Sequence, residues 1–325
     1  MVVLHVGIDD TDSPRGGCTT YIAALLVEEL ENRHAAFIEY PKLVRLNPNV
    51  PWKTRGNGAV SLSFVCPEDD VDEIKDVVTR IVEKNSDLGY PGTDPGIVFL
   101  EGDVPDELDL FAKTAISGMV EKGSALKLAK RFGADVRSFG DGRGVIGGLA
   151  AVGERLTGDH TYELLAYRTP KNRGSERKVD RDSVIVMDRL MHSETFNNFD
   201  YERGRILITP HGPDPILLGV RGESAEAVVK AYRMLRVEEP VERWVVFKTN
   251  QGTDAHLRKV DSIRELKPFY PVIVRGKVSE RPRVIPGRHV IFSLSDGTAE
   301  VDCAAYEPTG TLRKVAARLE VGDYI

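Results

Sequence analysis

Three carboxylates lie within four residues near the start of the chain, at Asp9, Asp10 and Asp12. They follow a short apolar run, so their mutual repulsion at the end of a buried strand requires a compensating charge. A divalent cation supplies that charge, and Mg²⁺ prefers one or two carboxylates together with water and phosphate oxygens. The pattern predicts a Mg²⁺ site at these residues, with an Asp-rich turn that caps a helix as the alternative.

A glycine pair separates the carboxylates from a predicted helix. Gly16 and Gly17 permit a close backbone approach, and the N–H groups at the helix start, near Thr19 and Thr20, favour an anion. Phosphate is the expected anion, although no Gly-x4-Gly-Lys-Ser/Thr loop is present. The hydroxyl groups of Thr19 and Thr20 and the thiol of Cys18 are each able to accept a phosphoryl group, and the residue types do not choose among them.

Two further glycine-rich loops supply cations. Lys53 and Arg55 are followed by Gly56 and Gly58, and Arg143 lies between two glycines. Positive side chains on flexible backbone are what a transferring phosphoryl group needs for charge stabilisation. The three loops together indicate a nucleotide phosphate site, while a lone Gly-Arg-Gly is more often an ordinary turn.

Hydrophobic periodicity indicates the elements that carry these loops. The first half reads as an α/β domain over residues 1–160, with strands at 2–8, 39–46 and 59–65, helices at 19–32 and 70–84, a partly helical stretch at 108–132 and an apolar helix or strand after the turn at 140–144. Residues 161–267 read as an α+β domain, with strands at 162–167, 205–209 and 243–249 and a helix at 224–235.

The last segment, 268–325, reads as short strands at 272–274, 290–294 and 299–305, with Asp296-Gly297 as a hairpin turn. Such strands suit a small barrel such as an OB-fold. The final residues, 322–325, read as the start of another strand, so the predicted barrel is incomplete.

The charge is unevenly distributed. The whole chain carries −6, but residues 67–110 hold fourteen acidic and three basic residues, a local net of −11, so the other 281 residues sum to +5. Residues 164–181 and 271–289 each carry +4. These basic stretches suit a nucleic-acid footprint, with ordinary solvated faces as the alternative. No apolar run approaches the roughly 20 residues of a membrane span, which predicts a soluble, cytoplasmic protein without a membrane partner.

Several motifs together resemble one family. GIDDTDS at 7–13, GGCTT at 16–20, VRLNP at 44–48, KTRGNGAV at 53–60 and GRGVIGGLAAVG at 142–153 are similar to the archaeal tRNA(Ile) 2-agmatinylcytidine synthetases, also called agmatidine synthases. ELLAYR at 163–168, GVRGES at 219–224 and CAAYEPT at 303–309 continue the match over nearly the whole chain.

The resemblance implies a kinase-like domain, a ferredoxin-like domain, an OB-fold and a C-terminal zinc ribbon. Family members use ATP to activate the wobble cytidine of an isoleucine tRNA and condense it with agmatine, so that the anticodon reads AUA. ATP ends as AMP and pyrophosphate, and the γ-phosphate is also found on a threonine of the CTT motif. The zinc-ribbon cysteines are absent here, since only Cys18, Cys66 and Cys303 are present, and truncation is the simplest explanation.

The implied residues follow from this match. The threonine maps to Thr19, and the expected catalytic residues are Asp12, Thr19, Lys53 and Arg55. The expected ATP-binding residues are Gly16, Gly17, Thr20, Lys53, Gly56, Asn57, Gly58 and Arg143, with Mg²⁺ on Asp9, Asp10 and Asp12. Agmatine is cationic, so carboxylates at Asp200 and Glu223 are expected to bind it, and Arg275, Lys277, Arg281 and Arg283 are expected to contact tRNA.

Two other functions compete with this one. One is a single-stranded nucleic-acid-binding protein whose Asp cluster is only structural. The other is a phosphotransferase that acts on a small amine or nucleotide without tRNA.

Overall fold

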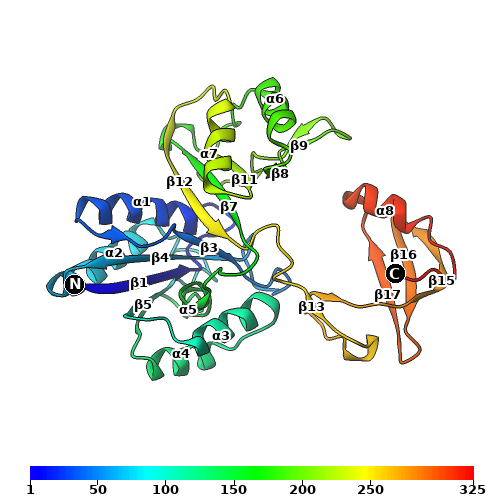
Figure 1. The fold of residues 1–325 in the computed structure, drawn as a ribbon, viewed down its shortest axis with the longest axis horizontal. Helices are drawn as coiled ribbons and strands as arrows, with labels where there is room; N and C mark the ends of the chain where they lie inside the picture. The colour runs from blue at the N-terminus through cyan, green and yellow to red at the C-terminus, as the bar shows by residue number, and fades with distance from the viewer. The chain divides into compact units, whose positions relative to one another are not determined.

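A computed structural model describes all 325 residues and divides them into two compact units, Met1–Ala255 and His256–Ile325 (Figure 1). The first unit is a mixed α/β structure built on a single large sheet. The second is a small β-rich unit with one helix. None of the helices is both long and apolar enough to cross a membrane.

Ten strands form the sheet of the first unit, in the order β6-β5-β1-β4-β3-β12-β7-β11-β8, with β2 paired to β4. All pairs are antiparallel except β3 with β12, where Lys42 and Leu43 pair in parallel with Lys248 and Thr249. This one junction joins the two halves of the unit, so the sheet runs across residue 160. The strands are β1 (Val2–Asp9), β2 (Ala36–Phe37), β3 (Lys42–Arg45), β4 (Gly58–Cys66), β5 (Gly96–Glu101), β6 (Asp135–Ser138), β7 (Thr161–Arg168), β8 (Thr195–Phe196), β11 (Ile216–Gly222) and β12 (Val241–Thr249).

Helices cover both faces of the sheet. Apolar residues of α1 (Thr19–Asn32) and α2 (Val71–Asn85) form one core with β1 and β4, while α3 (Asp106–Ser117), α4 (Lys122–Arg131) and α5 (Val145–Gly153) pack on the opposite face (Figure 1). In the second half, α6 (Arg181–Met191) and α7 (Ala225–Met234) form a further core with β7 and β11. A short hairpin of β9 (Phe199–Asp200) and β10 (Arg205–Ile206) lies beside them.

Helix α5 lies very close to strand β1 because glycines face each other there. A Cβ atom placed on Gly7 would lie 2.0 Å from the carbonyl oxygen of Gly148, and one placed on Gly147 would lie 1.9 Å from Oδ2 of Asp9. Only residues without side chains permit this approach. The turn at 140–144 therefore leads into a helix rather than a strand, and that helix reaches the carboxylates that follow β1.

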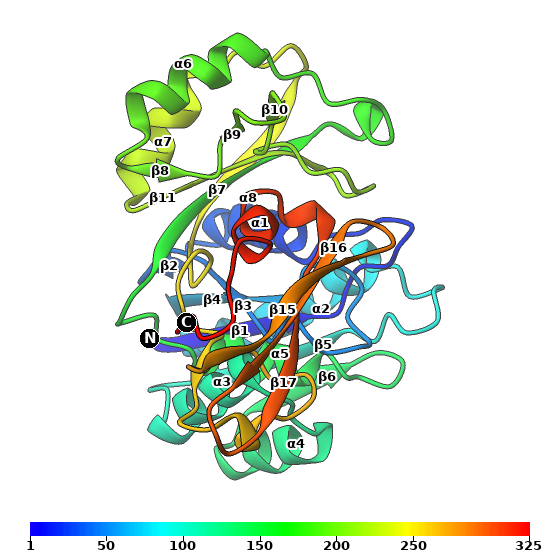
Figure 2. The same cartoon turned by 90° about the vertical axis from the view of Figure 1, so that its right-hand side faces the viewer.

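The second unit contains β13 (Arg258–Lys259) and β14 (Val272–Ile273), which pair in parallel, and the antiparallel strands β15 (Lys277–Ile285), β16 (His289–Ser295) and β17 (Glu300–Ala305) (Figure 2). Helix α8 (Thr311–Ala316) packs on this sheet through Ala316. The predicted turn at Asp296-Gly297 is confirmed between β16 and β17, and residues 322–325 pair with the start of β15. Strand β17 pairs only with β16, so the three strands form an open sheet.

Candidate active site

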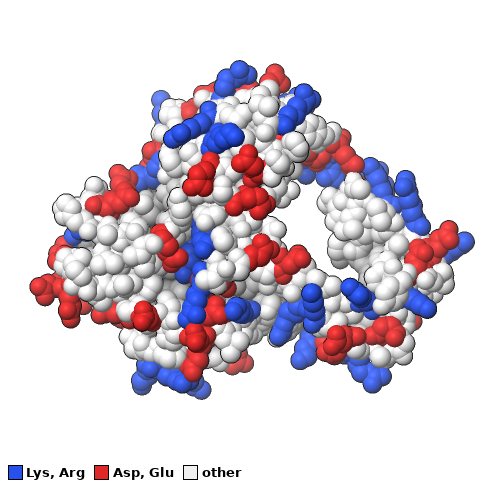
Figure 3. All heavy atoms as spheres, in the orientation of Figure 1, with Lys and Arg blue, Asp and Glu red and all other residues white.

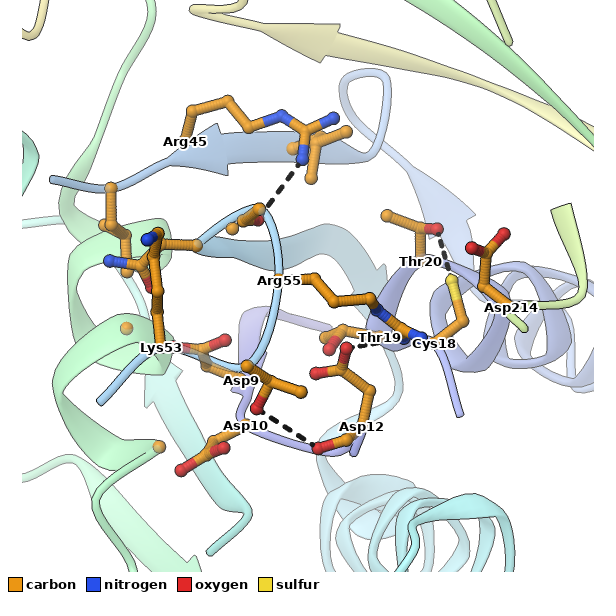
Figure 4. A pocket seen from close by; sticks show the side chains of 18 of the residues that line it. Asp9, Asp10, Asp12, Cys18, Thr19, Thr20, Arg45, Lys53, Arg55 and Asp214 are labelled. Carbon is orange, nitrogen blue, oxygen red and sulfur yellow. Dashed lines mark hydrogen bonds and ion pairs between the residues drawn. The ribbon is translucent and has the colours of Figure 1, made fainter. Parts of the chain in front are cut away.

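The first unit contains a pocket of about 350 Å³ (Figure 4). Residues from three separate loops and from the start of α1 line it, and among them are Asp9, Asp10, Asp12, Thr19, Thr20, Lys53, Arg55, Gly56, Asn57, Gly58 and Arg143. Most of the residues singled out by the sequence for ATP, metal and catalysis therefore share one cavity. Gly16 and Gly17 do not line it, although Gly17 contacts Asp12 from behind.

The Asp-rich loop is held in an unusual conformation. Asp9 is the last residue of β1, and Asp10 has a φ of 60°, in the left-handed region that non-glycine residues seldom adopt. The backbone oxygen of Asp12 accepts a hydrogen bond of 3.0 Å from the hydroxyl of Thr93. The loop is thereby fixed, and all three carboxylates face the same cavity.

Burial makes these carboxylates reluctant to ionise. It raises the pKa of Asp9 to about 8, with the neighbouring Asp10 and Asp12 adding to the shift. It also raises the pKa of Asp10 to about 6, even though Arg143 opposes the change, and raises the pKa of Asp12 against the influence of Arg55. The site therefore favours additional positive charge.

Two arginines and one lysine face this acidic loop. Arg55 forms an ion pair of 2.5 Å with Asp12 and donates a hydrogen bond of 2.7 Å to the carbonyl oxygen of Gly17. Arg143 is 3.7 Å from Asp10. Nη1 of Arg55 is buried without a hydrogen-bond partner, and the exposed Lys53 forms no ion pair. Buried donors without a partner at a pocket wall are suited to an anionic ligand.

The candidate phosphoryl acceptors lie at the first turn of α1. Cys18 is the N-cap residue, with extended backbone and no side-chain cap. The hydroxyl of Thr19 is 2.9 Å from the hydroxyl of Thr11, in the Asp-rich loop, while the hydroxyl of Thr20 is 3.0 Å from the sulfur of Cys18. Burial raises the pKa of the Cys18 thiol, which keeps it protonated and poorly nucleophilic.

The structure holds no group of three or more His, Cys, Asp or Glu side chains arranged to hold a metal ion. Asp12 is turned toward Arg55 and Asp10 toward Arg143, which explains why the three carboxylates do not converge on one point.

The opposite wall of the pocket comes from β3, β7, β11 and the loop before β11, and sequence reasoning missed its charged residues. Glu163 is buried between Arg45, at 3.2 Å, and Arg221, at 2.8 Å. Asp214 is also buried and lies beside Cys18, Thr20 and Arg55 (Figure 4). Glu163 and Arg221 fall inside two of the motifs that resemble the family, but nothing in the local pattern around Asp214 distinguishes it from an ordinary proline-rich turn.

Other residues singled out by the sequence lie outside the pocket. Asp200 is on the β9–β10 hairpin, 3.4 Å from Arg205, and Glu223 is exposed after β11. In the second unit Arg275, Lys277, Arg281 and Arg283 are all exposed, the last three on β15. Figure 3 shows basic and acidic side chains interspersed over the visible face of that unit.

Comparisons with known proteins agree on one family. The TiaS TCKD domain matches residues 5–68 and the TiaS FLD domain matches residues 142–256. The 2-agmatinylcytidine synthetase TiaS from Thermococcus sibiricus, which is named for its isoleucine tRNA, is 48% identical over 325 residues, which include 100% of this chain and 75% of that protein.

Solved structures agree with the sequence comparison. A complex of TiaS with its isoleucine tRNA and ATP has a TM-score of 0.93 and 40% identity, covering 100% of this chain and 77% of that one. A complex of TiaS with the same tRNA, AMPCPP and agmatine has a TM-score of 0.92 and 38% identity, covering 100% and 78%. With this identity and coverage, and with the shared fold, the chain belongs to the TiaS family of tRNA 2-agmatinylcytidine synthetases.

Proposed function

We infer that this chain is an ATP-dependent tRNA-modifying enzyme that synthesises agmatidine by joining agmatine to the wobble cytidine of an isoleucine tRNA. The observation that carries this inference is the joint one: the chain has the fold of TiaS crystallised with its isoleucine tRNA, ATP and agmatine, and it has a pocket lined by the loops that resemble the family. ATP, agmatine and the tRNA are its partners.

The phosphates of ATP are proposed to lie between the Asp-rich loop and the 53–58 loop. Lys53 has no ion-pair partner there, and Arg55 has a buried nitrogen without an acceptor. The N–H groups of the first turn of α1 lie at the same end of the pocket and add a favourable dipole. Each of these donors gains an acceptor when a triphosphate binds.

Asp9, Asp10 and Asp12 are proposed to hold Mg²⁺. The donor set fits, because carboxylate oxygens are the ligands Mg²⁺ prefers and because all three carboxyl groups have raised pKa values in a cavity that lacks a compensating charge for Asp9. Bound there, the ion would neutralise charge on the phosphate oxygens. The chain's own part is to keep Asp9 fixed against Gly147 and to pair Asp12 with Arg55.

Thr19 is the proposed acceptor of the γ-phosphate. Its hydroxyl contacts the Asp-rich loop through Thr11, whereas the hydroxyl of Thr20 faces Cys18. With γ-labelled ATP we expect Thr19→Val to lose the protein-bound label and Thr20→Val to keep it. The opposite pattern would move the acceptor to Thr20.

The finer organisation is also a proposal. We assign residues 1–160 to the kinase-like domain, 161–267 to the ferredoxin-like domain and 268–325 to an OB-fold that contacts tRNA through Arg275, Lys277, Arg281 and Arg283, in a cytoplasmic protein. The exposure of these four side chains supports the tRNA contact, as does the lack of an ion-pair partner for Arg275, Lys277 and Arg281.

One experiment tests the function directly. The chain is incubated with ATP, agmatine and the isoleucine tRNA transcript, and the nucleosides are analysed by mass spectrometry. We expect agmatidine from the wild-type chain, and we expect Asp12→Asn and Lys53→Ala to abolish its formation and the release of AMP. Lys127→Ala is the matched control, because Lys127 is an exposed lysine of α4 outside the pocket.

The outcomes separate the competing functions. AMP release that needs no tRNA and yields no agmatidine would favour a phosphotransferase. Unchanged AMP release by the Asp12→Asn and Lys53→Ala variants would contradict the proposed site.

A further inference from the structure

The basic segment at 164–181 is not simply a solvated surface, because two of its arginines point into the protein. Arg168 is 1% exposed and forms a bidentate pair with Glu239, with distances of 2.6 and 2.8 Å. The side chain of Arg177 is 11% exposed. These two charges are therefore used inside the first unit.

Arg177 organises the turn that precedes β11. Its Nε donates to the carbonyl oxygen of Ile216 at 2.7 Å, and its Nη2 donates to the carbonyl oxygens of Gly212 at 2.9 Å and Asp214 at 3.0 Å. The turn has no helix or strand hydrogen bonds of its own, and Pro213 and Pro215 have no N–H to donate. One buried guanidinium thus satisfies three carbonyl groups that the turn cannot satisfy itself.

This turn places Asp214 in the pocket. Its Oδ1 accepts hydrogen bonds from the backbone N–H of Ile216, at 3.2 Å, and from Arg177, at 3.4 Å. A Cβ atom on Gly212 would lie 2.8 Å from Oδ2 of Asp214, so the carboxylate occupies the space that the glycine leaves open. The position of Asp214 therefore depends on Arg177 on one side and Gly212 on the other.

Asp214 differs from the other carboxylates of the pocket. Arg55 pairs with Asp12, Arg143 faces Asp10, and Glu163 is held by two arginines. Asp9 belongs to the loop assigned to phosphate and metal. Arg177, the one arginine that contacts Asp214, spends most of its donors on backbone carbonyls. Asp214 thus retains unneutralised negative charge that faces the cavity, away from the carboxylates of the Asp-rich loop.

We propose that Asp214 receives a cationic group of agmatine and that Arg177 is the positioning residue that holds it in place. This inference rests on the proposed function, because agmatine is the cationic substrate of that reaction. It assigns the recognition of agmatine to the turn before β11 rather than to Asp200 or Glu223, which do not line the pocket.

The test measures agmatine binding to the full chain by calorimetry and the KM for agmatine in agmatidine synthesis. Asp214→Asn should weaken agmatine binding on the order of 10- to 100-fold, the factor that a charge-assisted hydrogen bond represents. Binding of ATP and labelling of the protein by γ-labelled ATP should remain unchanged. Arg173→Met is the matched control, because Arg173 belongs to the same basic segment but contacts Tyr21 and Glu242 instead of the turn.

Two variants test the positioning role. Gly212→Ala pushes against the flexible end of the Asp214 side chain, so it should raise the KM for agmatine with little change in stability. Arg177→Met should raise it as well, and should cause no further loss in the Asp214→Asn background, because both changes remove the same contact. Arg177→Lys, which keeps the charge and some of the donors, should lie between wild type and Arg177→Met.

Two results would overturn the inference. One is wild-type agmatine binding by Asp214→Asn, and the other is a fully additive loss in the double variant. A parallel loss of ATP binding in Asp214→Asn would also overturn it, since the carboxylate would then serve the pocket as a whole. A wild-type chain that forms no agmatidine would instead defeat the proposed function.

Discussion

The glycine contact between β1 and α5 gives the most quantitative prediction. In Gly7→Ala the new methyl group would lie 2.0 Å from the carbonyl oxygen of Gly148 and 2.7 Å from its carbonyl carbon. Ordinary contacts begin at 3.4 Å, so helix α5 must retreat by about 1.4 Å. Because the obstacle is backbone, no side-chain rotation relieves it.

The cost follows from overpacking. Inserting one methylene into a packed core costs about 1–3 kcal/mol, and we expect the upper end, about 3 kcal/mol, because a whole helix must move. For a domain of this size each kcal/mol lowers the melting temperature by roughly 2–4 °C, which gives a fall of about 6–12 °C. Calorimetry measures this fall in the transition of the first unit.

Gly147→Ala meets the same interface at the active site. Its methyl group would lie 1.9 Å from Oδ2 and 2.8 Å from Cβ of Asp9, so the carboxylate must leave its position. We expect agmatidine formation to fall by about 100-fold, since a misplacement of about 1 Å can cost that factor. Gly123→Ala is the control for both variants, because that helical glycine of α4 has open space around it and should be neutral or gain up to about 1 kcal/mol. A Gly7→Ala protein that melts with the wild type, or a fully active Gly147→Ala enzyme, would refute the close packing of α5 on β1.

Three other predictions concern buried and capping charges. Folded Asp9 and Asp10, with pKa values of about 8 and about 6, keep protons that the unfolded chain loses near 3.8, so the free energy of unfolding should fall as the pH rises from about 4 to 8. Asp9→Asn should flatten the upper part of that fall in urea denaturation, and an unchanged profile would contradict the shift. Lys42→Met should cost about 1–3 kcal/mol in the same assay, because the buried ammonium donates at 2.6 Å to the carbonyl of Glu154 at the end of α5. Asp296→Ala should make the second unit more sensitive to protease, because this carboxylate accepts hydrogen bonds from Ile263 and Thr298 that hold the β16–β17 turn; unchanged cleavage would contradict that role.

Local pattern was sufficient for the acidic side of the pocket. The carboxylates, the start of α1 at Thr19 and the 53–58 loop are each encoded within a few residues, and strands β1 and β4 bring them together by pairing directly. The same reasoning failed for β15, whose four charged residues and Pro282 are unlike a typical strand. Strand β15 lies at the edge of its sheet, where a proline and exposed charges are tolerated.

Long-range contacts explain what the sequence did not reveal. The parallel pairing of β3 with β12 joins residues about 200 positions apart, and it brings Arg45 toward Glu163 across the pocket. Likewise Arg168 is buried only because Glu239, 71 residues later, is there to pair with it. Clustered basic residues indicate a surface until their partners are known, and no local periodicity contains that information.

The acidic segment at 67–110 has a second role besides solvation. Asp87 accepts hydrogen bonds from Ser13, at 2.5 Å, and from Arg15, and Asp94 lies 3.5 Å from Arg143. Two of its fourteen acidic residues therefore brace the Asp-rich loop and one of its cations.

The charge of the pocket itself is balanced, and this suits the proposed reaction better than a basic pocket would. A purely cationic cavity would bind a triphosphate but repel agmatine, and a purely acidic one would do the reverse. Paired charges let the Asp-rich loop and its arginines serve the nucleotide while Asp214 serves the amine. The lining contains five acidic and five basic side chains, namely Asp9, Asp10, Asp12, Glu163 and Asp214 against Arg45, Lys53, Arg55, Arg143 and Arg221.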